Sequence, residues 1–214
     1  MTARRRNVMR VAAVVAVAVA VAVAVVVYGP RAGRRMKRPA PPREAAPLVE
    51  PGDPPPGPLP ELDAPSVLVE KRARRLTVFD GERPVKRYRV ALGSGRGDKQ
   101  REGDGCTPEG TFYICHHNPQ SSYHLSMGLS YPNAEDARRG LRDELISRSQ
   151  HDAIVSAIRR RTRPPWNTEL GGEIMIHGHG AGRDWTAGCV ALSNADVEEL
   201  YHALPDSTEV RIVP

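Results

Sequence analysis

Proline is distributed unevenly along this chain, and its distribution limits where a compact domain can form. Twelve of the 20 prolines fall within residues 30–65, where large apolar side chains are scarce. Proline fixes φ and has no N–H to donate, so such a segment cannot continue a helix or the interior of a sheet. We therefore predict a stiff, disordered linker at 30–65 and one folded domain at 66–214.

The chain before this linker has the composition of a membrane-directed segment. Val11 to Val27 contains only valine and alanine, and four arginines precede it. A basic start followed by an apolar run is typical of an export signal or an N-terminal anchor, and a spanning helix needs ~17–25 residues. We assign residues 1–29 to this segment and favour an anchor over a cleaved signal, with either Sec or twin-arginine export. The domain is then expected in the bacterial envelope, outside the cytoplasmic membrane.

The net charge of +6 could suggest a nucleic-acid partner, but its distribution argues against one. Residues 1–65 contain 10 Lys or Arg against 5 Asp or Glu, whereas residues 66–214 contain 21 against 20. The basic excess therefore lies beside the apolar segment, where it suits lipid headgroups or an anionic envelope polymer. We predict a membrane-associated protein with no nucleic-acid partner.

Short apolar runs bounded by turn residues dominate the remainder, which is typical of a mainly β domain. We predict strands at 67–69, 76–79, 88–92, 111–115, 174–176 and 208–213, and a loop at 118–133. Apolar residues at three- and four-residue steps predict one helix over 134–161, and Ser193 with Asp196 predicts a capped second helix. The fold class is therefore mainly β, of sandwich or barrel type, with peripheral α-helices.

One cysteine lies in a setting typical of a nucleophile. Cys189 directly follows Gly188, and His177 stands twelve residues upstream, at the end of a short apolar run. A thiol attacks as its thiolate, and histidine has the pKa that suits it to remove the proton near neutral pH. A glycine before the cysteine lets a substrate carbonyl approach backbone N–H groups. Either residue alone would indicate core packing, but together they predict a nucleophile and its base.

The block from His177 to Leu192, which ends in Asp-Trp-Thr-Ala-Gly-Cys-Val-Ala-Leu, resembles the L,D-transpeptidase catalytic domain of the YkuD type. The turn from Thr107 to Gly110 and the stretch from Leu125 to Ala134 are similar to the murein-acting branch of that family. The resemblance covers about residues 66–213. It implies a β-rich fold with the cysteine at the mouth of a groove, and no cofactor is expected.

The resemblance also implies roles for individual residues. Cys189 would be the nucleophile, and His177 the base that later acts as the acid. The N–H groups of Gly188 and Cys189 would be oxyanion donors, Thr186 would brace the turn through its hydroxyl, and Gly178 would support the histidine.

Three further residues are candidates for lining the substrate groove: Arg183, Trp185 and Tyr123. An arginine there would suit a carboxylate of a peptidoglycan stem peptide. The chain departs from the commonest family pattern at Ala187, where many members have histidine, and at Ala191, where many have asparagine or arginine. The spacing of twelve residues from histidine to cysteine is also shorter than in many members. The two substitutions fall at supporting positions and bear on substrate preference.

The implied reaction is acyl transfer on peptidoglycan stem peptides, through a thioester on Cys189. D-Alanine would leave, and an amine from a neighbouring stem or from a lysine of an envelope protein would resolve the thioester. With water as acceptor the same site would be an L,D-carboxypeptidase or amidase. A peptidoglycan-binding module without activity is the alternative of a different class.

A group of histidines with one cysteine has the side-chain types that could bind a metal ion. His116, His117, His124 and Cys115 lie close in sequence, but adjacent histidines in a strand point to opposite faces and no Cys-x-x-Cys accompanies them. We therefore predict no metal site. Cys106 and Cys115 could form a disulfide in an exported domain, or could equally be two buried thiols.

Overall fold

The computed structural model describes residues 57–214 of the 214-residue chain. The predicted membrane segment at 11–27 lies outside the described residues, as does the proline-rich linker up to residue 56. Within the described part, no helix is both long enough and apolar enough to cross a membrane.

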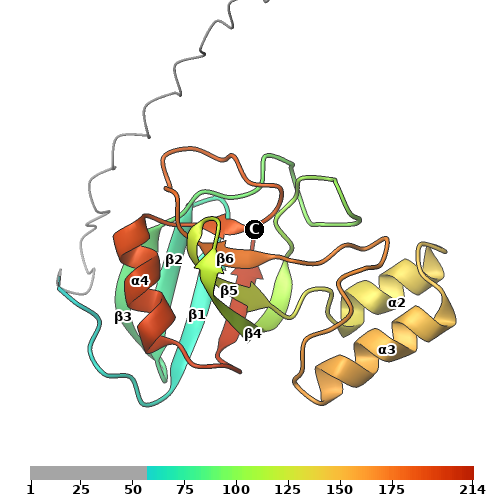
Figure 1. The fold of residues 1–214 in the computed structure, drawn as a ribbon, viewed down its shortest axis with the longest axis horizontal. Coiled ribbons are helices and arrows are strands. Elements are labelled where there is room, and N and C mark those ends of the chain that lie inside the picture. Colours follow the sequence, from blue (N-terminus) through green and yellow to red (C-terminus); the bar gives the residue numbers. More distant parts are fainter. Residues whose placement is uncertain (1–56) are drawn as a thin grey trace, which may run out of the picture. The chain divides into compact units, whose positions relative to one another are not determined.

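One eight-stranded sheet forms the body of the described domain, with strand order β3-β2-β1-β8-β4-β5-β6-β7 (Figure 1). The pairs β1–β8 and β6–β7 are parallel, and the other pairs are antiparallel. The strands are β1 Pro65–Glu70, β2 Arg75–Asp80, β3 Arg83–Arg89, β4 Gly110–Ser121, β5 His124–Leu129, β6 Met175–His177, β7 Val190–Ala191 and β8 Glu209–Val213. The predicted mainly β fold with peripheral helices is confirmed.

The central strands form because alternate residues are apolar and face one core. Val67 of β1 lies opposite Val78 of β2 on one side and opposite Val210 of β8 on the other. All three side chains are buried. Period-two burial of this kind fixes the register, since a slip of one residue would turn the apolar set toward water.

The sheet curls so that its two ends approach each other. The segment that follows β3 forms an antiparallel bridge from Ala91 to Ala191 of β7, and a parallel bridge from Gly93 to Thr186. Both N–H groups of the Ala91–Ala191 bridge donate to the opposite carbonyl at 2.8 Å. The glycine-rich loop after β3 is thereby brought against the turn that contains the cysteine.

The predicted loop at 118–133 is wrong, because this region is a β-hairpin. β4 continues to Ser121 and β5 begins at His124, leaving Tyr123 near the tip. Met127 and Leu129 face the core, while Ser126 and Gly128 alternate with them on the other face. Leu125, Met127 and Leu129 alternate with small and polar residues, which is a period-two signal that the predicted loop overlooked.

The predicted single helix at 134–161 is also wrong, because the segment forms two helices, α2 Ala134–Arg142 and α3 Arg148–Arg159. Each has its own capping box, with Asn133 as the N-cap of α2 and Ser147 as the N-cap of α3. The two helices pack on each other and enclose a small second core of Ala137, Ile146, Ile154 and Leu170. Figure 1 shows this pair beside the sheet, away from α4.

The last helix, α4 Asn194–Ala203, begins as predicted, with the Ser193 side chain accepting from the Asp196 N–H at 3.1 Å. It packs against β5 and β6, so its N-terminus lies beside the loop that follows His177. The chain just before Ser66 is also packed, since Leu59 and Leu62 are partly buried against the main core. The ordered domain therefore begins earlier than residue 66.

Candidate active site

His177 and Cys189 come together because β6 and β7 are neighbouring parallel strands. His177 ends β6 and is paired with Ala191, while Cys189 immediately precedes β7. Side chains two residues apart in a strand share one face of the sheet, so Cys189 and Ala191 face the same side, as do Met175 and His177. The side opposite this face holds the main core, with Ile176 and Val190 fully buried.

His177 is held in one orientation and one tautomer. Its Nδ1 lies 2.8 Å from the carbonyl oxygen of Gly178, so Nδ1–H donates there and Nε2 is left as the nitrogen that can accept a proton. The imidazole is buried, and this burial lowers its pKa, while the hydrogen bond to Gly178 acts in the opposite direction. The ring is therefore a neutral base at pH 7, oriented by a backbone carbonyl and not by an acidic residue.

The Cys189 thiol contacts the backbone of the segment leading into β6. The Met175 N–H donates to Sγ at 3.4 Å, and the thiol donates to the Glu173 carbonyl oxygen at 3.5 Å. Burial raises the thiol pKa, which the Met175 N–H and the Lys99 ammonium oppose and the Glu173 carboxylate reinforces. Within residues 57–214, no hydrogen bond joins the Cys189 thiol to the His177 ring. Hydrogen bonds between catalytic groups are often long when no substrate is bound.

The turn before Cys189 is closed by the Thr186 hydroxyl. This hydroxyl donates to the Cys189 carbonyl oxygen at 2.8 Å and accepts from the Gly188 N–H at 3.2 Å. Because the Gly188 N–H is already engaged there, it is not a free oxyanion donor in this structure. Of the two N–H groups that we expected to bind an oxyanion, the one on Cys189 is the remaining candidate.

Backbone from a distant part of the chain supports the same turn, which the sequence analysis missed. Gly188 has φ +136°, and a Cβ built on it would lie 2.7 Å from the carbonyl oxygen of Cys106. A Cβ on Gly93 would collide with the Gly105 carbonyl oxygen and lie 3.1 Å from the Gly188 Cα. The glycine-rich loop that follows β3 is therefore packed closely behind the turn that contains Cys189.

Aromatic rings surround His177. The Tyr123 ring centroid lies 4.7 Å from that of His177, and the Trp185 centroid lies 5.6 Å from it. Tyr123 is the exposed member of this group, and the indole N–H of Trp185 donates to the Gly180 carbonyl oxygen at 3.1 Å. Arg183 is exposed in the same loop and makes no hydrogen bond or ion pair within residues 57–214. The structure thus gathers Tyr123 and Trp185 around the histidine but does not bring Arg183 into contact with them.

Two polar side chains hold this loop, and neither was identified from the sequence. Asp184 accepts from the Arg74 guanidinium at 2.6 Å and from the Leu92 N–H at 3.0 Å. Asn194, in the first turn of α4, accepts from the His179 N–H at 2.9 Å. The same Asn194 oxygen would lie 2.6 Å from a Cβ at Gly178, which explains why glycine follows the histidine.

The residues weighed as zinc ligands lie apart. His117 pairs with Asp206 at 2.8 Å, and His124 pairs with Glu198 at 2.6 Å. Among residues 57–214, no group of three His, Cys, Asp or Glu side chains is placed to hold a metal ion. All three cysteines of the chain lie in the described part, and each is a free thiol, so Cys106 and Cys115 do not form a disulfide.

The chain matches the family model of the L,D-transpeptidase catalytic domain (YkuD) over residues 64–212. This range covers well over half of the 214 residues, and the chain belongs to that family. The resemblance noted in the block from His177 to Leu192 is thereby confirmed. A comparison with curated proteins gave no match.

Solved structures of similar fold include Pgp2, a helical cell shape determining protein of Campylobacter jejuni, with 24% identity and a TM-score of 0.49. They also include L,D-transpeptidases from Xylanimonas cellulosilytica (15%, TM-score 0.43) and Mycobacterium tuberculosis (13%, TM-score 0.42). These alignments cover 70%, 72% and 71% of this chain, but only 47%, 62% and 62% of the respective neighbours. The family assignment rests on the family model and not on these distant likenesses.

Proposed function

We propose that this protein is a cysteine acyltransferase that acts on peptidoglycan stem peptides. The observation that carries the proposal is the pairing of β6 with β7, which places the Cys189 thiol and an oriented, neutral His177 on one face of the sheet. Membership of the L,D-transpeptidase family supports the substrate class.

In the proposed reaction His177 Nε2 takes the Cys189 proton. The sulfur then forms a bond to the carbonyl carbon of the diamino acid that precedes the terminal D-alanine in the stem peptide. The bond to the terminal D-alanine nitrogen then breaks, and His177 returns the proton to that nitrogen. The nitrogen of an amine, from a second stem peptide or from an envelope protein lysine, then forms a bond to the thioester carbonyl carbon, and its proton passes to His177. The C–S bond breaks, and His177 returns the proton to the Cys189 sulfur. One histidine acting as base and acid typically contributes ~10²–10⁴ in rate.

The burial of His177 predicts how the reaction rate depends on pH. His177 must be neutral to act as the base, and burial lowers its pKa, so activity should persist to lower pH than for an ordinary histidine. We expect kcat/KM for D-alanine release to fall only as pH drops below the ordinary histidine value of ~6.5. Initial rates measured across that region test this, and an acidic midpoint above that value would contradict it.

The function itself is tested with purified protein and tetrapeptide muropeptides, with and without a second amine-bearing stem peptide. Release of D-alanine together with a cross-linked product would establish the transferase. Release of D-alanine and free tripeptide alone would indicate the L,D-carboxypeptidase. Binding without either product would overturn the proposal in favour of a peptidoglycan-binding module.

We further propose that the domain works outside the cytoplasmic membrane, tethered by its N-terminal segment. The support is compositional, namely the apolar run at 11–27, the basic residues beside it and the proline-rich linker at 30–65. An anchored protein should keep its first 29 residues after export. N-terminal sequencing of the protein recovered from membranes tests this prediction, and a mature chain that begins beyond Tyr28 would contradict it.

A further inference from the structure

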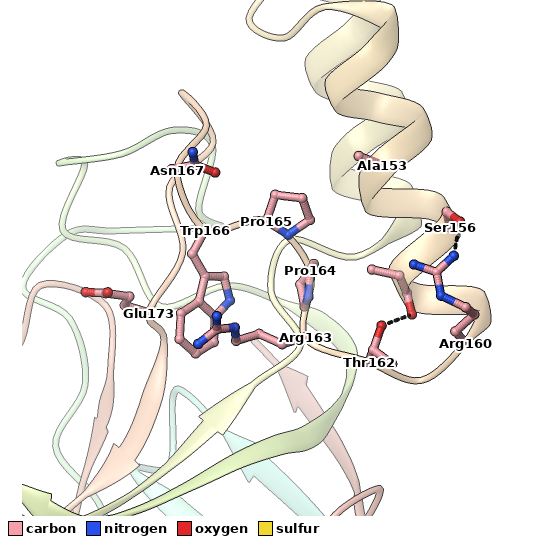
Figure 2. A pocket seen from close by; sticks show the side chains of 11 residues that line it. Ala153, Ser156, Arg160, Thr162, Arg163, Pro164, Pro165, Trp166, Asn167 and Glu173 are labelled. Atoms are coloured by element: carbon pink, nitrogen blue, oxygen red, sulfur yellow. Dashed lines mark hydrogen bonds between the residues drawn. The ribbon is translucent and has the colours of Figure 1, made fainter.

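A groove of ≈ 630 Å³ lies beside the candidate active site (Figure 2). Its walls are the C-terminal part of α3, the segment from Thr162 to Asn167, and Glu173. None of these residues belongs to the group around His177. The groove is partly polar, and two arginines, Arg160 and Arg163, contribute to it.

Two glycines allow the indole of Trp166 to form the floor of this groove. A Cβ at Gly172 would collide with Trp166, and a Cβ at Gly128 would lie 3.0 Å from its ring. The same position at Gly128 is 3.3 Å from the sulfur of Met175, the residue whose N–H contacts Cys189. The indole therefore packs directly on β5 and β6, next to the backbone that surrounds the thiol.

Glu173 connects the groove to the thiol, whereas His177 does not line the groove. Glu173 lines the groove, and its carbonyl oxygen accepts from Cys189 Sγ at 3.5 Å, while His177 lies four residues further along the same segment. Glu173 also has φ +54°, a left-handed conformation that a non-glycine residue keeps only where its surroundings fix it.

Both charged groups at this end of the site are available to a ligand. The Arg163 guanidinium lies over the Trp166 ring, 5.0 Å from its centroid, and makes no ion pair within residues 57–214. The exposed Glu173 carboxylate likewise has no hydrogen-bond or ion-pair partner in the described chain. Figure 2 shows the guanidinium against the indole, with the prolines and Glu173 on opposite sides of the ring in this view. A guanidinium held on an aromatic face is well suited to bind a carboxylate.

We propose that this groove binds the acyl part of the donor peptide, with Arg163 paired to one of its carboxylates and Glu173 to the side-chain amine of the acylated diamino acid. The argument rests on the proposed function, because His177 must protonate the leaving amine. The amine therefore departs on the side of His177, and the acyl chain extends from the carbonyl carbon to the other side, toward Glu173. Trp166 provides an apolar surface for the methylene groups of that chain.

Binding is measured by calorimetry with full-length Cys189→Ala protein, which cannot turn the ligand over. The probes are a tetrapeptide with free carboxylates and the same peptide with those carboxylates amidated. We expect Arg163→Gln to weaken binding of the free acid about tenfold, and to remove most of the preference for the acid over the amide. Glu173→Gln should weaken binding of both peptides, and blocking the side-chain amine by acetylation should abolish that effect.

Arg159→Gln is the matched control, because Arg159 is an exposed arginine near the end of α3 that does not line the groove. Equal affinities of the Arg163→Gln and Arg159→Gln proteins for both peptides would overturn the proposal. A wild-type protein that binds the tetrapeptide but releases no D-alanine would instead contradict the proposed function. The affinities of the variants would still test the groove assignment by themselves.

Discussion

Replacement of Cys189 by alanine is expected to reduce D-alanine release from tetrapeptide muropeptides by about 10⁴-fold or more, to the level without enzyme. The reason is that no thioester can form, and loss of a covalent nucleophile removes the whole two-step pathway. The measurement is D-alanine release over time by the wild-type and variant proteins at equal concentration. Mass spectrometry of the wild-type protein during turnover should show the acyl adduct on Cys189.

Cys115→Ala is the control for this prediction, because Cys115 is a free thiol in β4 that does not belong to the site. Burial raises the pKa of Cys115 to about 12, so it is not a competing nucleophile at neutral pH. The variant should release D-alanine at the wild-type rate. Retained activity in Cys189→Ala, or an adduct on another cysteine, would contradict the assignment of the nucleophile.

Replacement of Gly93 by alanine is expected to have the largest effect on stability. Its Cβ would collide with the Gly105 carbonyl oxygen, and it would also press on the Gly188 Cα at 3.1 Å. Both obstacles are backbone and cannot rotate away, so we expect a loss of about 2–4 kcal/mol in the free energy of unfolding. Urea denaturation measures this loss. The rate at which the Cys189 thiol reacts with a small disulfide reagent should also change, because the turn that contains it is displaced.

Gly97→Ala provides the comparison within the same loop. A Cβ at Gly97 would meet no atom within 4 Å, but φ there is +81°, so the only cost is the left-handed backbone. That cost is about 1 kcal/mol. If both variants lost the same stability, the close packing of Gly93 against the turn that contains Cys189 would not be the cause.

The parts of this fold that the sequence predicts are those fixed by local pattern. The strand around Val67 is a short apolar run, the strand around Val210 alternates apolar and charged residues, and the cap of α4 is a local contact between Ser193 and Asp196. The hairpin around Tyr123 and the break between α2 and α3 were missed. The hairpin does carry a period-two signal, in Leu125, Met127 and Leu129, but it is short and lies among polar residues. At the break between the helices, the helical spacing of apolar residues continues.

In the candidate site, too, the residues that the sequence predicts are those recognised from their immediate neighbours in the chain. The histidine and the cysteine are recognised from the residues that flank them, within one short block of sequence. The groups that hold them in place are distant in sequence, as with Arg74 on Asp184 and the Cys106 carbonyl behind Gly188. No sequence pattern links such residues, because their contacts exist only once the ends of the sheet approach each other. The groove at Trp166 was missed because it forms only when α3 and the segment after it pack against the sheet.

Burial raises the pKa of the Cys189 thiol, and this affects how the thiol reacts with oxidants while no substrate is bound. Peroxides and disulfides react with thiolates far faster than with thiols. A cysteine that stays protonated at rest, and ionises only when a bound substrate and the neutral imidazole draw off its proton, is protected from such oxidants. We therefore expect the resting Cys189 thiol to react more slowly with peroxides and disulfides than an ordinary cysteine does.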